Sequence, residues 1–192
     1  MAKSRFARAS RLGRDRADSV RVLARPGIAL YGAAGEIASD ADEEPWRAAA
    51  GPGPPPFEPA LSWHARVLMI KDLAPGDSVS YHARYVARER ERIAVLGVGY
   101  ADGWPLALSN RGHVLLRGRP VAIRGAVCMD LTMVDATPFP DLQAGEIATL
   151  IGTQGASSRS AEDVASESGG IAYSILTGIG PRVRRRYTEE PG

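Results

Sequence analysis

The chain of 192 residues is 44% hydrophobic and carries a formal net charge of +2 at pH 7, which is typical of one or two globular domains and indicates no particular class of partner. A single cysteine, Cys128, excludes an internal disulfide framework and a cysteine cluster around a metal. No apolar stretch is long enough to cross a membrane, and the basic N-terminus lacks the apolar segment of a secretory signal, so we expect a cytoplasmic protein without membrane association.

The first segment of the chain is basic. Residues 1–25 hold eight lysines and arginines against two acidic residues. Such a segment could bind nucleic acid, but Phe6 is its only aromatic residue, so a solvated helix face is the simpler interpretation and we do not expect a nucleic-acid partner. The apolar run "GIALYG" follows. We expect residues 1–35 to form a helix and then a strand.

A proline-rich stretch comes next. Residues 40–60 contain six prolines and an acidic cluster. Proline removes a backbone donor and fixes φ, so this stretch is neither a central strand nor a helix interior. We expect residues 36–60 to be an exposed linker or long loop.

From residue 61 the chain is built of short apolar segments separated by glycine, proline and aspartate. The segments are "LSWHARVLMIKDL", "RIAVLGVGY", "HVLLRG", "RPVAIRGAVCMD", "LTMVDA" and "IATLIG". Their spacing predicts a mainly antiparallel β domain over residues 61–187, either a barrel or a sandwich. One helix is expected near residues 160–168, because Ser160 is a suitable N-cap, Asp163 stands at N3 and Gly169 follows the last helical residue.

Common site motifs are absent from the sequence. His64, His82 and His113 lack metal-ligand spacing, so no metal is expected. There is no glycine-rich phosphate loop before a helix and no G-x-S-x-G. Several tyrosines stand at the ends of predicted strands, where a side chain can reach a ligand from a rigid scaffold.

Taken together, seven motifs carry a family resemblance. In chain order they are "ARPGIALYG", "PGDSVSY", "GVGYADGWP", "LSNRGHVLLRG", "IRGAVCMDLTMVD", "AGEIATLIGTQG" and "AEDVASESGGIAYSILTGIGPRVRRRY". Over residues 24–187 the chain resembles alanine racemase, the pyridoxal-phosphate enzyme that interconverts L- and D-alanine for the bacterial cell wall. The resemblance implies that the β domain is of the alanine racemase C-terminal type and that residues 1–35 are a short α/β remnant of a cofactor-binding (β/α)₈ barrel.

The resemblance also implies site residues on the substrate side. Tyr81 matches the tyrosine that acts as acid and base on one face of the substrate α-carbon. A free phenol has a pKa of about 10, so such a base needs a lowered pKa or a neighbour that takes its proton. Tyr100 matches a tyrosine at the entrance of the active site. Met129 matches the residue whose backbone amide meets the substrate carboxylate, and Cys128 beside it is expected to be a packing residue.

Four further positions match the family's cofactor contacts. Arg25 corresponds to the arginine that faces the pyridine nitrogen and holds its own proton too firmly to protonate that ring. Gly27 and Ile28 fall where backbone N–H groups bind the phosphate, and Tyr173 matches the tyrosine that holds it. The cofactor implied is therefore pyridoxal 5'-phosphate.

One departure from the family matters most. The family is about twice as long, and its cofactor lysine lies in a "KANAYGHG"-like segment that has no counterpart here. Lys3 and Lys71 are the only lysines, and neither stands in such a context. Covalent attachment of the cofactor needs an amine, so we expect none in this chain, and we expect the chain to be inactive by itself.

These observations leave two classes of function. The first is an alanine racemase in truncated or split form, acting on alanine as a homodimer or with a separate barrel chain. The alternative is a non-catalytic β domain that acts only in dimerisation or interaction. An RNA-binding β-barrel is a weaker third possibility, suggested only by the basic termini.

Overall fold

The structure is a computed structural model that describes residues 27–33 and 59–188. The chain divides into two compact units, residues 1–58 and 59–192, and each is described by itself. In the first unit Gly27–Tyr31 forms a 3-10 helix, η1, in place of the strand expected at the end of residues 1–35. The expected helix before it and the proline-rich stretch up to residue 58 lie outside the described residues.

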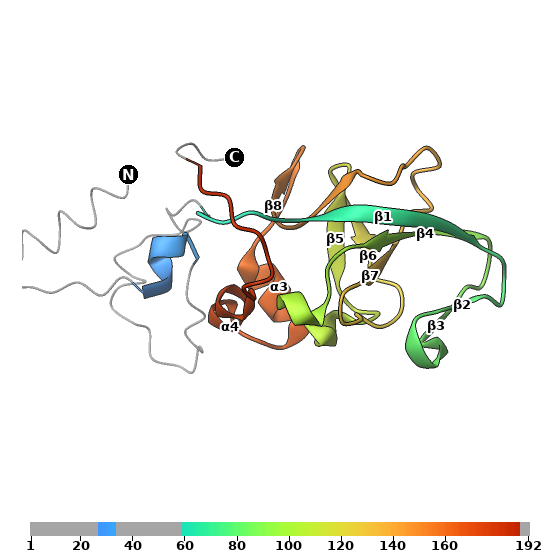
Figure 1. Cartoon of the computed structure of the whole chain (residues 1–192), viewed down its shortest axis with the longest axis horizontal. Helices are drawn as coiled ribbons and strands as arrows, with labels where there is room; N and C mark the ends of the chain where they lie inside the picture. Colours follow the sequence, from blue (N-terminus) through green and yellow to red (C-terminus); the bar gives the residue numbers. More distant parts are fainter. Residues whose placement is uncertain (1–26, 34–58, 189–192) are drawn as a thin grey trace, which may run out of the picture. The chain divides into compact units, whose positions relative to one another are not determined.

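The second unit is an antiparallel β domain (Figure 1). The largest sheet has the strand order β6-β5-β8-β1-β4-β7, with β9 on β8, and β2 and β3 form a separate hairpin. All these pairs are antiparallel, which confirms the mainly β fold class. The strands are β1 (Trp63–Leu73), β2 (Ser78–Val79), β3 (Tyr85–Val86), β4 (Glu91–Leu96), β5 (His113–Leu116), β6 (Arg119–Ala122), β7 (Thr132–Asp135), β8 (Ile147–Gln154) and β9 (Ser157–Arg159).

The two ends of the large sheet meet. Ile123, which follows β6, forms an antiparallel bridge with Val134 of β7. Beside it, the Arg124 amide donates to the Met133 carbonyl at 2.9 Å. The sheet therefore closes on itself as a barrel, which decides between the two predicted architectures and leaves few unpaired strand edges.

The alternation of side chains along the strands separates two hydrophobic layers. On β4, Ala94 and Leu96 are fully buried, and Ile93 and Val95 point to the opposite face. Ile93 belongs to a second apolar cluster on this outer face, whose other buried members are Leu73, Val79, Ala87 and Met133. Because Val79 and Ala87 come from the β2–β3 hairpin and the residue after it, this cluster attaches the hairpin to the outside of the barrel.

Two short helices follow the barrel strands, α3 (Ala161–Ser168) and α4 (Ala172–Gly178). The predicted α3 is confirmed with its capping box: Asp163 N–H donates to Ser160 Oγ at 3.1 Å, and Ser160 N–H donates to the Asp163 carboxylate at 2.7 Å. Gly169 closes the helix at φ 71°. Helix α4 was not predicted, because it spans only seven residues and begins after Ile171, which is no polar N-cap.

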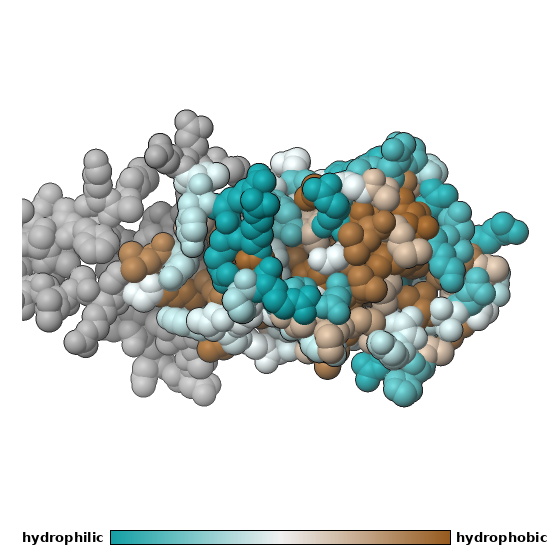
Figure 2. Space-filling view, viewed as in Figure 1, coloured by the Kyte–Doolittle hydropathy of each residue, from teal (hydrophilic) through white to brown (hydrophobic). Residues whose placement is uncertain are grey.

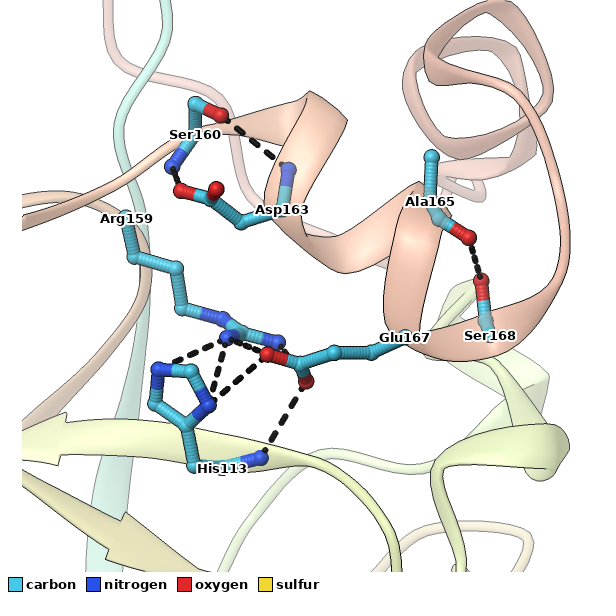
Figure 3. A network of polar contacts seen from close by, with 7 residues as sticks. All are labelled: His113, Arg159, Ser160, Asp163, Ala165, Glu167 and Ser168. Atoms are coloured by element: carbon cyan, nitrogen blue, oxygen red, sulfur yellow. Dashed lines mark hydrogen bonds and ion pairs between the residues drawn. The ribbon is translucent and has the colours of Figure 1, made fainter.

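A buried polar network attaches α3 to the barrel (Figure 3). The Arg159 side chain is 0% exposed and donates to both Glu167 carboxylate oxygens at 2.7 Å. His113 of β5 has Nδ1 2.8 Å from Glu167 Oε1 and Nε2 2.9 Å from Arg159 Nη1, which fits a neutral ring that donates through Nδ1. Burial and the Arg159 charge lower the pKa of His113. Burial opposes ionisation of Glu167, but the hydrogen bonds from Arg159 hold the pKa of that carboxyl below its usual value.

Candidate functional site

The Tyr81 turn joins β2 to β3 and presents its phenol to solvent. Tyr81 opens the 3-10 helix η2 (Tyr81–Ala83) and is 72% exposed. Three residues around it have left-handed backbone conformations: Ser80 at φ 62°, His82 at φ 59° and Ala83 at φ 46°. Such conformations cost non-glycine residues on the order of 1–3 kcal/mol each and persist only where the surroundings impose them.

Hydrogen bonds from two other loops impose this conformation. Ser80 Oγ accepts from the Ala126 amide at 2.7 Å. At the other end of the turn, the Arg84 carbonyl accepts from the Asn110 side chain at 2.7 Å. The backbone around Tyr81 is therefore bonded at both ends, whereas within the described residues its own hydroxyl makes no hydrogen bond.

The turn that carries Tyr100 is a second fixed element. It is the 3-10 helix η3 (Tyr100–Asp102), whose Asp102 carboxylate accepts from the Gly99 amide at 3.0 Å. A Cβ at Gly99 would clash with the carbonyl oxygens of Cys128 and Met129, so only glycine allows this approach. The Tyr100 amide donates to the Cys128 carbonyl at 2.9 Å. The turn thus lies directly on the segment that contains Met129.

The Gly125–Met129 segment connects both tyrosine turns, and we call it the central loop. Its Ala126 amide donates to the Tyr81 turn, and its Met129 carbonyl accepts from Ala101 at 3.0 Å. The Val127 amide donates to Ser109 Oγ at 3.0 Å and the Cys128 amide to the Leu131 carbonyl at 2.8 Å. Within residues 27–33 and 59–188 the Met129 amide donates to no other group. The central loop therefore connects the turns of Tyr81 and Tyr100 to the available N–H of Met129. We call these three residues the rim.

An arginine missed by the sequence analysis links the same two elements. The Arg182 guanidinium lies 2.5 Å from an Asp130 carboxylate oxygen and 3.3 Å from one of Asp102. The hydrogen bond to Asp130 raises the pKa of Arg182 above its usual value. Arg182 is half exposed, so its contribution is to hold the Tyr100 turn against the residues after Met129 rather than to stabilise the fold strongly.

The cofactor-contact residues are spread over three parts of the chain. Tyr173 lies on α4, and its side chain is half exposed. The C-terminal end of α4 lies close to the Tyr100 turn, as shown by the clash that a Cβ added at Gly103 would make with the Gly178 carbonyl. Gly27, at φ 55°, and the buried Ile28 lie on η1 in the first unit. Arg25 lies outside the described residues. The structure therefore places the C-terminal end of α4 at the Tyr100 turn, and Gly27 and Ile28 belong to a separate unit.

Tyr85, four residues after Tyr81, shows what a tyrosine in a structural role looks like here. Its hydroxyl donates to Glu91 at 2.5 Å, and the Arg124 guanidinium lies over its ring at 4.9 Å. Burial and then the Glu91 carboxylate raise the pKa of Tyr85 to about 12. Sequence spacing cannot separate the two tyrosines, because Tyr81 comes just after β2 and Tyr85 begins the equally short β3.

Among the described residues, Tyr173 carries a hydroxyl that could hold a phosphate, and no lysine stands on the loops that carry Tyr81, Tyr100 and Met129. Lys71, the one lysine among the described residues, lies near the end of β1 opposite Ile93 rather than on those loops. No described His, Cys, Asp or Glu residues form a group of three that could hold a metal ion. Burial raises the pKa of the half-buried Cys128 thiol, which suits packing better than nucleophilic chemistry.

An apolar surface lies on β1. A β-bulge between Val67 and Met69 turns both Leu68 and Met69 outward, and each is about half exposed. Figure 2 shows hydrophobic residues gathered over β1 and β4 between polar areas. Contiguous apolar patches of this kind are typical of interaction surfaces. In the described part of the chain, each helix is too short or too polar to cross a lipid bilayer.

Comparison with known proteins places these features in a family. Residues 60–187 match the family model "Alanine racemase, C-terminal domain". The alanine racemase of Halothermothrix orenii is 41% identical over 172 residues, which cover 88% of this chain and 42% of that protein. The structure of alanine racemase from Bacillus anthracis with bound L-Ala-P is 39% identical, with a TM-score of 0.67 over 82% of this chain and 37% of that one. Alanine racemase from Bartonella henselae with covalently bound pyridoxal phosphate is 32% identical, with a TM-score of 0.70 over 84% of this chain and 40% of that one.

Proposed function

The chain belongs to the alanine racemase family through its C-terminal domain, and on this premise we propose that it supplies one wall of an alanine racemase active site. It spans about 40% of the length of the relatives it matches. The observation that carries the proposal is the Tyr81 phenol, which is exposed and unbonded within the described residues although its backbone is tied at both ends. A fixed backbone that presents an available side chain suits a pre-organised site.

Each residue of the rim has a separate task in this proposal. The Tyr81 hydroxyl gives a proton to, or takes it from, the α-carbon of alanine on one face. The Met129 amide binds the substrate carboxylate, and Tyr100 borders the entrance. Two acid–base groups on opposite faces are needed to invert a carbon centre, so the second group comes from outside this domain.

Pyridoxal phosphate, when bound, withdraws electrons from the substrate α-carbon and so makes its proton easier to remove. By the family resemblance, the Tyr173 hydroxyl corresponds to one that holds the phosphate. In the first unit, Gly27 and Ile28 correspond to backbone contacts to a phosphate, and Arg25 corresponds to the residue that faces the pyridine nitrogen. No described amine lies near the rim, and Lys3 and Lys71 are the only lysines among these 192 residues, so the covalent anchor would come from a separate barrel chain rather than from a second copy of this one.

The apolar surface around Leu68 and Met69 supports pairing with such a partner. The same surface also favours the second candidate function, a domain that acts only in dimerisation. A cytoplasmic location is part of the proposal, as the family resemblance implies.

The test is a complementation assay in which this chain is mixed with a racemase barrel domain that lacks its own C-terminal domain. We expect D-alanine to be formed, and Tyr81→Phe to lower the rate by about 10²- to 10⁴-fold, the usual contribution of a general acid–base group. Tyr187→Phe is the matched control, because it removes a hydroxyl that is 92% exposed near the C-terminus.

Restored activity that Tyr81→Phe leaves unchanged would overturn the role of Tyr81. Stable association of the two chains without any racemisation would favour the non-catalytic alternative.

A further inference from the structure

We propose that Asn110 is a positioning residue that holds the Tyr81 turn in the conformation required for proton transfer, a proposal that rests on the role given to Tyr81 above. Asn110 is the chain's sole asparagine and stands between the 3-10 helix η4 (Leu106–Leu108) and β5. Asn110 is not one of the rim residues, but its hydrogen bonds connect the backbone segments that carry them.

Both ends of the Asn110 amide are used. Nδ2 donates to the Arg84 carbonyl at 2.7 Å, and Oδ1 accepts from the Gly125 amide at 2.5 Å. The Asn110 backbone amide donates in addition to the Gly125 carbonyl at 3.1 Å. One residue therefore connects the end of the Tyr81 turn to the start of the central loop.

The opposite end of the turn is attached to the next residue of the same loop. Ser80 Oγ accepts from Ala126, and a Cβ at Gly125 would lie 2.6 Å from that oxygen. Gly125 also has φ 82°, so its neighbours and its backbone both require glycine. Because the central loop ends at Met129, these bonds fix the backbone of the Tyr81 turn relative to the segment that carries Met129.

The backbone conformation explains why the ties are needed. Ser80, His82 and Ala83 have positive φ, and a free turn would relax toward negative φ at these residues. Asn110 itself has φ 55°, which asparagine adopts at less cost than most residues. Loss of its side-chain bonds would release the turn rather than unfold the barrel, because Tyr85 after the turn is held separately by Glu91 and Arg124.

The variant that tests this is Asn110→Asp. It replaces the Nδ2 donor with an oxygen, so the Arg84 carbonyl faces an acceptor, and the other oxygen can still accept from Gly125. The matched control is Gln154→Glu, because Gln154 Nε2 donates to the Ile147 carbonyl at 2.9 Å and its Oε1 accepts from the Gly118 amide at 3.0 Å. The control makes the same change from amide to carboxylate in a side chain of β8 that also donates one hydrogen bond and accepts one.

The first readout needs no activity. In the full chain labelled with ¹³C-tyrosine and ¹⁵N, Asn110→Asp should shift or broaden the Tyr81 ring signals and raise the hydrogen-exchange rate of the Ala126 amide about tenfold, the effect of about one lost hydrogen bond. Gln154→Glu should change neither signal. Asn110→Gly, which keeps the left-handed conformation and deletes both side-chain bonds, should act like Asn110→Asp even if the aspartate variant folds poorly. Unchanged Tyr81 signals in the folded glycine variant would overturn the proposal.

The second readout is a double-mutant cycle in the complementation assay. Asn110→Asp should lower kcat about tenfold with little change in KM, and it should cause no further loss once Tyr81 is already phenylalanine. Equal losses in both backgrounds would show that Asn110 does not act through Tyr81. If instead Tyr81→Phe alone has no effect, the proposed role of Tyr81 fails, and the Tyr81 ring signals still report whether Asn110 positions the turn.

Discussion

Two polar regions of the same barrel use their hydrogen bonds in opposite ways. In the network of Arg159, Glu167 and His113, the side chains bond to one another and are turned inward (Figure 3). On the rim that carries Tyr81, Tyr100 and Met129, the bonds are made largely by the backbone, and the tyrosine side chains are left exposed. The first region fastens a helix to a strand, whereas the second fixes the backbone of the tyrosine turns and leaves their side chains available to a ligand.

A concentration of charged and polar residues therefore does not by itself mark a functional site. The cluster around Arg159 bonds mainly within itself, because a buried charge must be paired, although Arg159 Nε is buried without a hydrogen-bond partner among the described residues. On the rim, the structural hydrogen bonds are made by the backbone of the two tyrosine turns, so the phenols remain free within the described residues. The pair Tyr81 and Tyr85 shows the same contrast within five residues.

We expect the largest loss of stability from a substitution in the network of Arg159, Glu167 and His113. Glu167→Gln leaves the fully buried Arg159 without its ion partner and should lower the free energy of unfolding by about 3 kcal/mol, the low end for a broken buried pair because Glu167 is partly exposed. Urea unfolding measures the change. Glu89→Gln, at an exposed position, should have little effect. If Glu167→Gln also shifted the Tyr81 ring signals, the two regions would not be independent.

A second change breaks the rim. Gly99→Ala forces a Cβ against the carbonyl oxygens of Cys128 and Met129, and should cost about 1–3 kcal/mol of stability through displaced backbone. Gly170→Ala is the control, since its Cβ would meet only the Ser174 hydroxyl at 3.2 Å and the Ser168 hydroxyl at 3.6 Å. Amide chemical shifts should change at Tyr100 and Met129 and stay constant at His113. A Gly99→Ala variant as stable as wild type would show that the loop contact is not tight.

The third change sharpens the comparison of the two tyrosines. Tyr85→Phe removes a hydroxyl bonded to Glu91 and should lower the free energy of unfolding by about 1–2 kcal/mol. Tyr81→Phe removes an unbonded exposed hydroxyl and should change stability by less than about 0.5 kcal/mol. Thermal and urea unfolding of the two variants provide the measurement. Equal losses would contradict the distinction between a structural and an available phenol.

The smallest expected effect is a pH dependence of the network. The pKa of His113 is lowered in the folded state by burial and Arg159, so folding favours the neutral ring. The stability gained is complete above the unfolded-state pKa of about 6.5 and decreases as the pH falls below it. Replacing His113 with glutamine should flatten urea-unfolding free energies between pH 7 and pH 5.5. His64, whose pKa is also lowered by burial, must be replaced in the control, and a slope that disappears only there would assign the effect to His64.

Local patterns in the amino-acid sequence predict most elements of the β domain. Apolar runs between turn residues located the long strands β1, β4 and β8, and the spacing of Ser160, Asp163 and Gly169 determined where α3 begins and ends, because capping acts within one helical turn. The ordered motifs identified the family. The division into residues 1–35, 36–60 and 61–187 and the roles of the site residues stay predictions, and Arg25 lies outside the described residues.

Long-range contacts in the fold establish how the sheet closes and which polar groups of the described residues remain free. Closure depends on the bridge of Ile123 to Val134, and the Tyr81 turn depends on Asn110, which lies 26 residues after Arg84 in the chain. Helix α4 is too short to be stable from its own sequence and forms against α3. Local propensity contains no information about such contacts, because a hydrogen bond between distant backbone segments depends on the packing of the whole barrel. For the same reason, the sequence could name Tyr81 as a candidate, but only the fold could show that its hydroxyl is available and that of Tyr85 is not.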